Sequence, residues 1–380
     1  MLTKIVQSIL VASAFMIPVI GHFAINNDTI FQNENRNAFA YPQDYHDKYW
    51  DELQKAHNDR LVGRETFQVL TSTYLSNICS QTTDFSYKDA FAFKGNSMGW
   101  FYLGDEGRKY YQQHILPVKQ KDIFYEKNLS LLKHLELIAP NNTYMVVGPD
   151  KASVYPEFMN QHIGYPGKYR HFENIKADLE KAGVKVIDNQ EAIVKEKDLT
   201  YEKSLYFAND SHWNKKGALF AFNNTIKELL GDEFTPLTYD FTWKKLMVGD
   251  LNKSQYISEL KQILDLCEPV SKENSEVTSI DLEDNTQETG IRQFGSDDFI
   301  RCNVNSGTCN YEKIINSRSR KDLKVALISD SFGGFFEPYL VYYFKVVLWC
   351  NAYEDHTKIL KYVSEFQPDI ILYLRVERSI

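Results

Sequence analysis

Residues 325–334 read Val-Ala-Leu-Ile-Ser-Asp-Ser-Phe-Gly-Gly, an apolar run that changes abruptly into a turn. The four apolar residues predict a buried strand, and the glycine pair leads into a helix. Ser331 then lies in a strand-to-helix turn at the edge of a sheet. Its hydroxyl is exposed there, and the backbone N–H groups of Ser331, Phe332 and Gly333 can hold a developing oxyanion. The alternative is that Ser331 only caps the helix.

Four further runs have the same strand character, and they alternate with helical patterns. The other predicted strands are 144–147, 184–187, 345–348 and 370–373. Apolar residues at three- or four-residue spacing predict helices that end before Pro140, Gly183, Gly231 and Pro368. This alternation indicates a central, mostly parallel five-stranded sheet with helices on both faces. Ligands of such folds bind at the carboxyl ends of the strands.

Composition places the chain among globular proteins. Of its 380 residues, 43% are apolar and 25% are charged, which excludes a disordered or collagen-like chain. The 43 basic and 51 acidic side chains give a net charge of −8, and this disfavours a nucleic-acid binder because such proteins need a basic surface. No nucleic-acid partner is therefore expected.

The cysteines and histidines predict neither a disulfide scaffold nor a metal site. The five cysteines are an odd number, so at least one is unpaired. Cys302 and Cys309 bracket a turn-rich stretch and either close a local disulfide or stay reduced. Neither a C-x-x-C pair nor a His-x₃-His spacing occurs, so no zinc site is predicted, and no cofactor is expected.

The N-terminal segment predicts a membrane anchor. No formally charged residue occurs from Ile5 to Ile25, and only Lys4 and the terminal amine precede this run. As a helix it would span about 30 Å, the thickness of the hydrocarbon core. Residues 1–27 are expected to stay attached as an anchor helix, with a cleaved signal peptide as the alternative. Lys4 places the N-terminus in the cytoplasm and the residues after about 27 outside it.

Residues 209–214 read Asn-Asp-Ser-His-Trp-Asn and lie just before a predicted helix. In such a connection the Asp210 carboxylate can reach Nδ1–H of His212, which leaves Nε2 free as a base. A serine hydroxyl attacks an ester only after a base removes its proton, so this pair supplies what Ser331 needs. The sequence therefore predicts a Ser331–His212–Asp210 triad. The alternative makes Asp210 or Asn214 a helix cap and His212 an ordinary surface residue.

These motifs resemble those of the SGNH-hydrolase-like polysaccharide O-acetyltransferases of the alginate O-acetyltransferase type. Residues 210–213 are similar to the family's D-x-H-W motif, and residues 330–332 to its nucleophile block. Further similar stretches are 34–36, 58–59 with Arg64, 95–101, 149–157, 368–369 and 376–378. The resemblance implies an SGNH-hydrolase-like or flavodoxin-like α/β sandwich and the same triad.

The resemblance also implies an activity and partners. The implied reaction moves acetyl groups onto hydroxyls of an exported or cell-surface polysaccharide through an acyl-enzyme on Ser331. Its implied partners are the polysaccharide acceptor and a membrane-bound acyltransferase-like donor protein, with the catalytic domain on the periplasmic or cell-surface side. Two alternatives stay open: a carbohydrate acetylesterase with the same triad, and a non-catalytic glycan-binding assembly subunit.

The expected organisation is an anchor or signal segment at 1–27, a helical connection at 28–90 and a catalytic domain at 91–380. An acidic insertion occupies about 234–320, and residues 271–299 within it carry eight acidic side chains against two basic ones. This composition is typical of a solvated segment outside the core. The chain departs from the family at Ser329, where Gly or Thr is common, and this bears on the oxyanion hole.

Four residues near the motifs are expected to bind substrate: Lys151, Tyr155, Trp213 and Arg378. Lys151 follows a predicted strand and either contacts substrate or pairs with a carboxylate. Tyr155 and Trp213 either stack on sugar rings or pack in the core. Arg378 either orients a substrate carboxylate or closes the edge of the fold.

Overall fold

The computed structural model describes residues 30–31, 36–37, 40–43, 49–59, 92–94, 100–103, 123–158, 172–198, 204–208, 210–246, 264–270, 274–283, 285, 287–293 and 311–380. The chain divides into two compact units, 1–85 with 247–262 and 86–246 with 263–380. In the first unit, β1 (Ile30–Phe31) and β2 (Arg36–Asn37) form an antiparallel pair, and α2 spans Tyr49–Asp59.

The predicted anchor at 1–27 lies outside the described residues. Within the described ranges, no helix is both long and apolar enough to cross a membrane.

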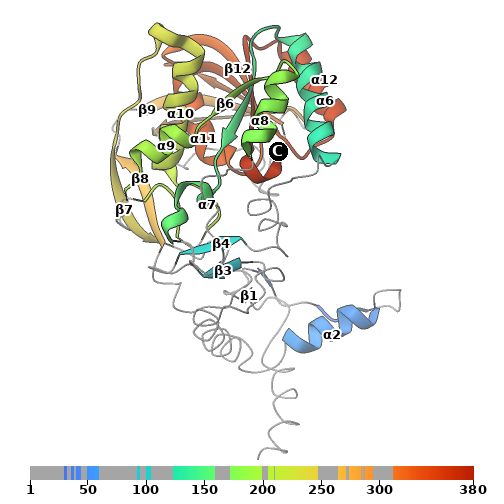
Figure 1. Cartoon of the computed structure of the whole chain (residues 1–380). Coiled ribbons are helices and arrows are strands. Elements are labelled where there is room, and N and C mark those ends of the chain that lie inside the picture. The colour runs from blue at the N-terminus through green and yellow to red at the C-terminus, as the bar shows by residue number, and fades with distance from the viewer. Residues whose placement is uncertain are drawn as a thin grey trace, which may run out of the picture. The chain divides into compact units, whose positions relative to one another are not determined.

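The second unit is built on an eight-stranded sheet with the strand order β10-β9-β11-β13-β12-β14-β5-β6. Figure 1 labels β9, β12 and β6 of this sheet. The neighbouring strands β13, β12, β14, β5 and β6 run parallel to one another. They span Phe344–Asn351, Lys321–Ser329, Ile370–Val376, Thr143–Gly148 and Lys185–Asp188. Each overlaps one of the five strands predicted from the sequence, so the parallel part of the sheet is confirmed.

Three antiparallel strands extend this sheet and correct two expectations. β9 (Asn274–Asp281) pairs with β10 (Gln287–Gln293) and with β11 (Tyr311–Asn316), and β11 also pairs with β13. The sheet is therefore mixed and eight-stranded, and the acidic segment supplies strands to it. Val277 and Ser279 are buried whereas Glu276 is exposed, so the segment alternates between core and solvent. The many acidic residues obscure this two-residue alternation of buried and exposed side chains in the sequence.

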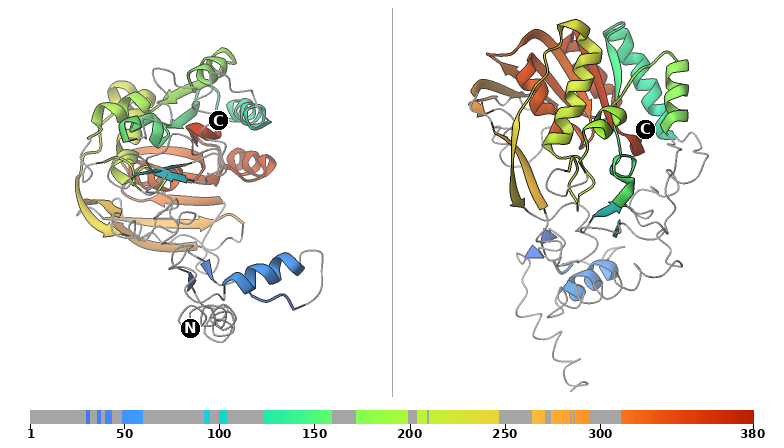
Figure 2. Two further views of the ribbon diagram at one scale, coloured as in Figure 1. Left: turned by 60° about the horizontal axis from the view of Figure 1, so that its bottom comes forward. Right: turned by 60° about the vertical axis from the view of Figure 1, so that its left-hand side comes forward.

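Helices cover both faces of the sheet (Figure 2). α6 (Ile123–Ile138), α8 (Phe172–Lys181) and α12 (His356–Phe366) join one face in a shared apolar core. α11 (Gly333–Tyr343) packs on the opposite face, as right-handed crossovers from β12 to β13 and from β13 to β14 require. α10 (Lys215–Leu230) packs against α11, and α9 (Gln190–Glu196) against α10.

The helix ends predicted from the sequence are also confirmed. α6 and α12 stop just before Pro140 and Pro368, while α8 and α10 stop close to Gly183 and Gly231. Gly183 and Gly231 have φ values of 86° and 53°, which favour glycine because it has no Cβ.

The remaining elements of this unit are short. β3 (Ala92–Lys94) and β4 (Phe101–Leu103) form one antiparallel pair, and β7 (Asp240–Leu246) and β8 (Leu264–Val270) form another. Helix α7 (Lys151–Val154) follows β5, and 3-10 turns span Pro156–Phe158, Gly231–Glu233 and Glu377–Ser379. Because β12, β14 and β5 are adjacent and parallel, the residues that follow them meet at one edge of the sheet.

Candidate active site

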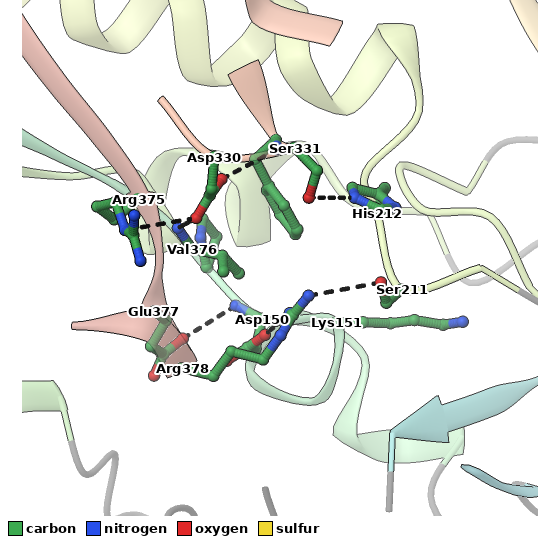
Figure 3. A network of polar contacts seen from close by, with 12 residues as sticks. Asp150, Lys151, Ser211, His212, Asp330, Ser331, Arg375, Val376, Glu377 and Arg378 are labelled. Carbon is green, nitrogen blue, oxygen red and sulfur yellow. Dashed lines mark hydrogen bonds and ion pairs between the residues drawn. The ribbon is translucent and has the colours of Figure 1, made fainter. Parts of the chain in front are cut away.

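Ser331 lies in a tight turn between β12 and α11 (Figure 3). The Gly333 N–H donates to the Asp330 carbonyl at 2.9 Å, and the Gly334 N–H donates to the Ser331 carbonyl at 3.2 Å. These bonds turn the chain directly from the strand into the helix and leave Ser331 exposed at the carboxyl edge of the sheet. The structure thus contains the strand-to-helix turn predicted from residues 325–334.

The Asp330 carboxylate anchors this turn to the neighbouring strand. Oδ1 accepts the Phe332 N–H at 3.0 Å, and Oδ2 accepts the Val376 N–H at 2.8 Å. Nε of Arg375, on β14, lies 3.7 Å from Oδ2, and both side chains are almost completely buried. The carboxylate therefore joins the ends of β12 and β14 (Figure 3).

Gly333 is required by the close approach of the turn to its own strand. A Cβ at this position would lie 1.8 Å from Oγ of Ser329, far inside van der Waals contact. Oγ of Ser329 accepts a hydrogen bond from Nε1 of Trp349 at 2.9 Å. Ser329 is the residue that differs from the resembled motif. Its side chain packs directly against Gly333, so it fits only because residue 333 has no Cβ.

A short chain reversal carries Asp210 and His212. Tyr206 and Trp213 form an isolated bridge, and the Phe207 N–H donates to the His212 carbonyl at 3.3 Å. Asn214 caps α10, because its side chain accepts the Gly217 N–H at 3.0 Å. Of the two caps considered from the sequence, the structure therefore uses Asn214.

The structure brings together the three residues of the predicted triad. Oγ of Ser331 lies 2.7 Å from Nε2 of His212, although the two residues are 119 positions apart. Nδ1 of His212 lies 2.6 Å from Oδ1 of Asp210, and the same oxygen accepts the His212 backbone N–H at 2.9 Å. With Nδ1–H donating to the carboxylate, Nε2 is the acceptor that faces the serine hydroxyl. This arrangement can withdraw the serine proton during attack on an ester.

Trp213 connects the His212 segment to the nucleophile turn. Its indole N–H donates to the Phe332 carbonyl at 3.1 Å, and its ring centroid lies 4.9 Å from that of Phe332. The His212 ring also packs against Phe332, at a centroid distance of 5.1 Å. Both sides of the Ser331–His212 contact are thus held against one aromatic ring.

The four expected substrate-binding residues are buried, which corrects that expectation. Tyr155 and Trp213 have no exposed surface, and Lys151 and Arg378 are only 4% and 9% exposed. Hydroxyl Oη of Tyr155 accepts the Leu205 N–H at 2.9 Å, and burial raises its pKa, so it stays a neutral phenol. None of the four offers a face on which a sugar ring can stack.

Arg378 links three parts of the site. Its Nη1 donates to Oδ1 of Asp150, and its Nη2 donates to Oγ of Ser211 at 3.4 Å. Its guanidinium carbon lies 5.4 Å from the centre of the Phe332 ring. The Asp150 N–H in turn donates to Oε2 of Glu377 at 3.0 Å. This corresponds to the alternative in which Arg378 closes the edge of the fold (Figure 3).

Tyr206 is a neutral phenol that donates a hydrogen bond to the backbone next to Asp150. Its hydroxyl donates to the Pro149 carbonyl at 2.5 Å. Burial raises the pKa of Tyr206 well above its usual value, and the Asp150 and Glu377 carboxylates add to the effect.

The expected oxyanion hole needs revision. The N–H groups of Phe332 and Gly333 both donate to Asp330, to its side chain and to its carbonyl respectively, so they already have acceptors. Of the three expected donors, only the Ser331 N–H has no acceptor among the described residues. The backbone N–H groups of Phe332 and Gly333, which the motif predicts as oxyanion donors, therefore close the tight turn that exposes the serine.

The sequence predictions missed the buried charged groups that support the site. Arg375 interrupts an otherwise apolar strand, which is a signal for a partnered charge, and it ion-pairs with Asp330. Asp150 and Glu377 each follow a predicted strand at its carboxyl end, where charged residues commonly serve a site.

The described residues test only part of the predictions about metal sites and cysteines. No cluster of potential metal ligands occurs among the described residues. Cys302 and Cys309 lie outside them, so their disulfide stays a prediction. Cys350 is a buried free thiol, and burial raises its pKa.

A comparison with protein families decides the family. The family described as the SGNH hydrolase-like domain of the acetyltransferase AlgX matches residues 97–289, just over half of the chain. The chain belongs to this family. The matched region of this SGNH hydrolase-like acetyltransferase contains Asp210 and His212, and Ser331 follows it. None of the curated proteins matches the sequence.

Two solved structures of Bacillus cereus PatB1 agree with this assignment at the level of the fold. Bacillus cereus PatB1 with a sulfonyl adduct is 16% identical, with a TM-score of 0.52 over 76% of this chain and 96% of that chain. A second PatB1 structure is 18% identical, with a TM-score of 0.51 over 75% and 96%. The O-acetyltransferase domain of Pseudomonas putida AlgJ is 16% identical, with a TM-score of 0.43 over 76% and 91%.

Proposed function

We propose that this member of the SGNH hydrolase-like acetyltransferase family transfers acetyl groups to hydroxyls of an exported or cell-surface polysaccharide through Ser331. The observation that carries the proposal is the continuous contact from Ser331 to His212 at 2.7 Å and from His212 to Asp210 at 2.6 Å. A serine, a base within hydrogen-bond reach and a carboxylate that orients the base are the parts that acyl transfer needs.

In the first half of the reaction, Ser331 accepts the acetyl group. Its oxygen attacks the carbonyl carbon of an acetyl ester or thioester while Nε2 of His212 takes the hydroxyl proton. The tetrahedral intermediate collapses, the bond to the leaving group breaks, and the imidazolium returns the proton to that group. Asp210 stabilises the transient charge on the ring and keeps Nδ1 protonated.

In the second half, a hydroxyl of the polysaccharide takes the place of the leaving group. His212 removes its proton as its oxygen attacks the acetyl-serine, and the proton then returns to Oγ of Ser331. The product is an acetylated sugar and a regenerated enzyme. Water in the same position would give acetate, so the proposed transferase has to favour the sugar over water.

The proposal includes a location and a donor. Residues 1–27 hold the chain in the membrane, with the catalytic domain on the outer side, and a membrane-bound acyltransferase-like protein delivers the acetyl group. Lys4 and the uncharged run from Ile5 to Ile25 support this orientation.

We expect the chain in the membrane fraction at its full length, detected by immunoblotting with an antibody against residues near its C-terminus. A soluble species shorter by about 25 residues, the length of a cleaved signal peptide, contradicts the anchor. It leaves the proposed chemistry unaffected, because Ser331, His212 and Asp210 all follow the segment.

A donor–acceptor assay separates the proposed transferase from an esterase. With the detergent-solubilised full chain and an aryl acetate as donor, we expect release of the aryl alcohol and, when oligosaccharides are added, acetylated sugar detected by mass spectrometry. Acetate release that no tested sugar changes, with no acetylated product, identifies an esterase.

The same assay tests the non-catalytic alternative. A subunit that only binds glycan releases neither aryl alcohol nor acetylated product, but it retains oligosaccharide in equilibrium dialysis. Binding without turnover over the background hydrolysis rate therefore rejects the catalytic proposal.

A further inference from the structure

Lys151 is a buried cation directed at the segment that carries the acid and the base. It is the first residue of α7 and follows the end of β5, and only 4% of its surface is exposed. Its Nζ donates to the Ala208 carbonyl at 2.6 Å and to the Asp210 carbonyl at 3.0 Å. Both acceptors belong to the segment that leads to His212, and Figure 3 shows Lys151 beside Ser211 and His212 of that segment.

Two aromatic rings also lie close to the Lys151 ammonium. Nζ lies 4.8 Å from the centre of the Trp100 ring and 5.4 Å from that of Tyr102. Both rings are buried, and the Tyr102 hydroxyl donates to the Tyr155 carbonyl at 2.6 Å, which locks the cluster to the end of α7. The cation therefore has both these aromatic rings and the backbone of the catalytic segment as its neighbours.

Burial of the Lys151 ammonium is energetically unfavourable because it moves the charge out of water, so its contacts must indicate why a charged side chain is present at this position. A methionine of similar length would fill the same space without that penalty. What the ammonium adds is a pair of charge-assisted hydrogen bonds to two carbonyls of one short segment.

Those two bonds fix the direction of the peptide groups around Asp210. With the carbonyls of Ala208 and Asp210 both turned toward Lys151, the Asp210 side chain is presented to His212. Nδ1 of His212 then lies 2.6 Å from Oδ1 of Asp210 and its Nε2 2.7 Å from Oγ of Ser331. A displacement of about 1 Å in such an alignment lowers a rate by about 100-fold.

We propose that Lys151 is a positioning residue that holds the backbone of residues 208–212 so that His212 stays aligned with Ser331. The inference rests on the proposed function, because alignment matters only if these groups react. It replaces the sequence expectation that Lys151 contacts substrate.

The test compares Lys151→Met with a matched lysine. Lys197 also donates to a backbone carbonyl, that of Val154 at 2.9 Å, and its Nζ lies 5.7 Å from the centre of the Tyr155 ring. It also pairs with Glu157, and none of these partners belongs to the segment that carries Asp210 and His212. Lys197→Met therefore removes a comparable lysine from the same region without touching the catalytic segment.

For Lys151→Met we expect kcat for aryl-acetate turnover to fall about 10- to 100-fold with KM changed less than about threefold. The rate at which a sulfonyl fluoride labels Ser331 should fall by the same factor. Lys197→Met should keep both values within about twofold. Lys151→Arg, which keeps the charge, should lose less activity than Lys151→Met.

Three results would overturn the proposal. Unchanged kcat in a folded Lys151→Met shows that alignment does not depend on the ammonium, and a raised KM with unchanged kcat shows that the lysine binds substrate. If Lys151→Met does not fold, Lys151→Gln, which keeps an N–H donor but loses the charge, decides: a lower kcat at unchanged KM supports positioning by the ammonium, and an unchanged kcat contradicts it.

The Ser331→Ala variant in the same assay separates the two levels of inference. If it is inactive while Lys151→Met is fully active, only the positioning role is wrong. If it keeps wild-type activity, the proposed function fails and the role of Lys151 fails with it.

Discussion

Ser331→Ala is expected to lower aryl-acetate turnover by about 10⁴-fold or more while leaving the fold unchanged. The substitution removes the oxygen on which the proposed acetyl-enzyme forms, and the alanine side chain has no nucleophilic atom. Ser331 is exposed and its hydroxyl is hydrogen-bonded to Nε2 of His212, so the loss of one surface hydroxyl should change the free energy of unfolding by no more than about 0.5 kcal/mol.

Turnover, covalent labelling and urea denaturation together check this expectation. A sulfonyl fluoride should add one label to the wild-type chain, mapped by peptide mass spectrometry to Ser331, and none to the variant. Ser317→Ala is the matched control: it removes another exposed serine hydroxyl, one that donates to the Glu276 carbonyl at 3.2 Å and belongs to the turn after β11. Retention of full turnover by Ser331→Ala, or labelling of another serine, refutes the acyl-enzyme.

The fold could be predicted where strands and helices are apolar without interruption. The central parallel strands β12, β14 and β5 are largely buried on both faces, so each contains a continuous apolar run between turn signals. The edge strand β6 has only Ile187 buried, but its apolar residues still mark it as a strand. β9 and β10 escaped prediction because one face of each is polar: Glu276 and Thr289 are exposed on a segment whose acidic composition suggests solvent. Alternation of burial, visible only once Val277 and Ser279 are placed, identifies them as strands.

The proximity of the three proposed catalytic side chains was also within reach of the sequence. Asp210 and His212 are two residues apart, and Ser331 directly follows a predicted strand, so local chemistry and topology suffice. The environment of Lys151 was not within reach, because it depends on Trp100 and Ala208, which lie 51 residues before it and 57 residues after it in the chain. The burial of Lys151 is set by such distant contacts, and the residues next to it in the sequence do not indicate it.

The donors of the oxyanion hole show the same limit. A strand-to-helix turn presents its N–H groups to a ligand only if no internal acceptor takes them. Here the Asp330 carboxylate and carbonyl accept from Phe332 and Gly333. The motif alone does not reveal whether an aspartate before the serine faces the substrate or the turn.

Asp330→Ala is expected to destabilise the fold by about 3–5 kcal/mol, because it removes one partner of a buried ion pair and strands the other. The carboxylate accepts two backbone N–H groups, at 3.0 and 2.8 Å, and lies 3.7 Å from Nε of Arg375, which is itself only 4% exposed. Its loss leaves two buried donors and one buried cation with fewer acceptors. Urea denaturation followed by fluorescence should show a lower midpoint at an unchanged slope.

Two companion variants show whether the buried charge is the cause. Asp322→Ala removes the partner of Lys345 from a pair of 2.8 Å whose side chains are 80% and 50% exposed, and it should cost less than about 1 kcal/mol. Adding Arg375→Met to Asp330→Ala should recover part of the lost stability, since no unpaired cation then remains. If the double variant is no more stable than Asp330→Ala alone, or if Asp330→Ala is as mild as Asp322→Ala, the carboxylate does not hold the nucleophile turn in the way its contacts indicate.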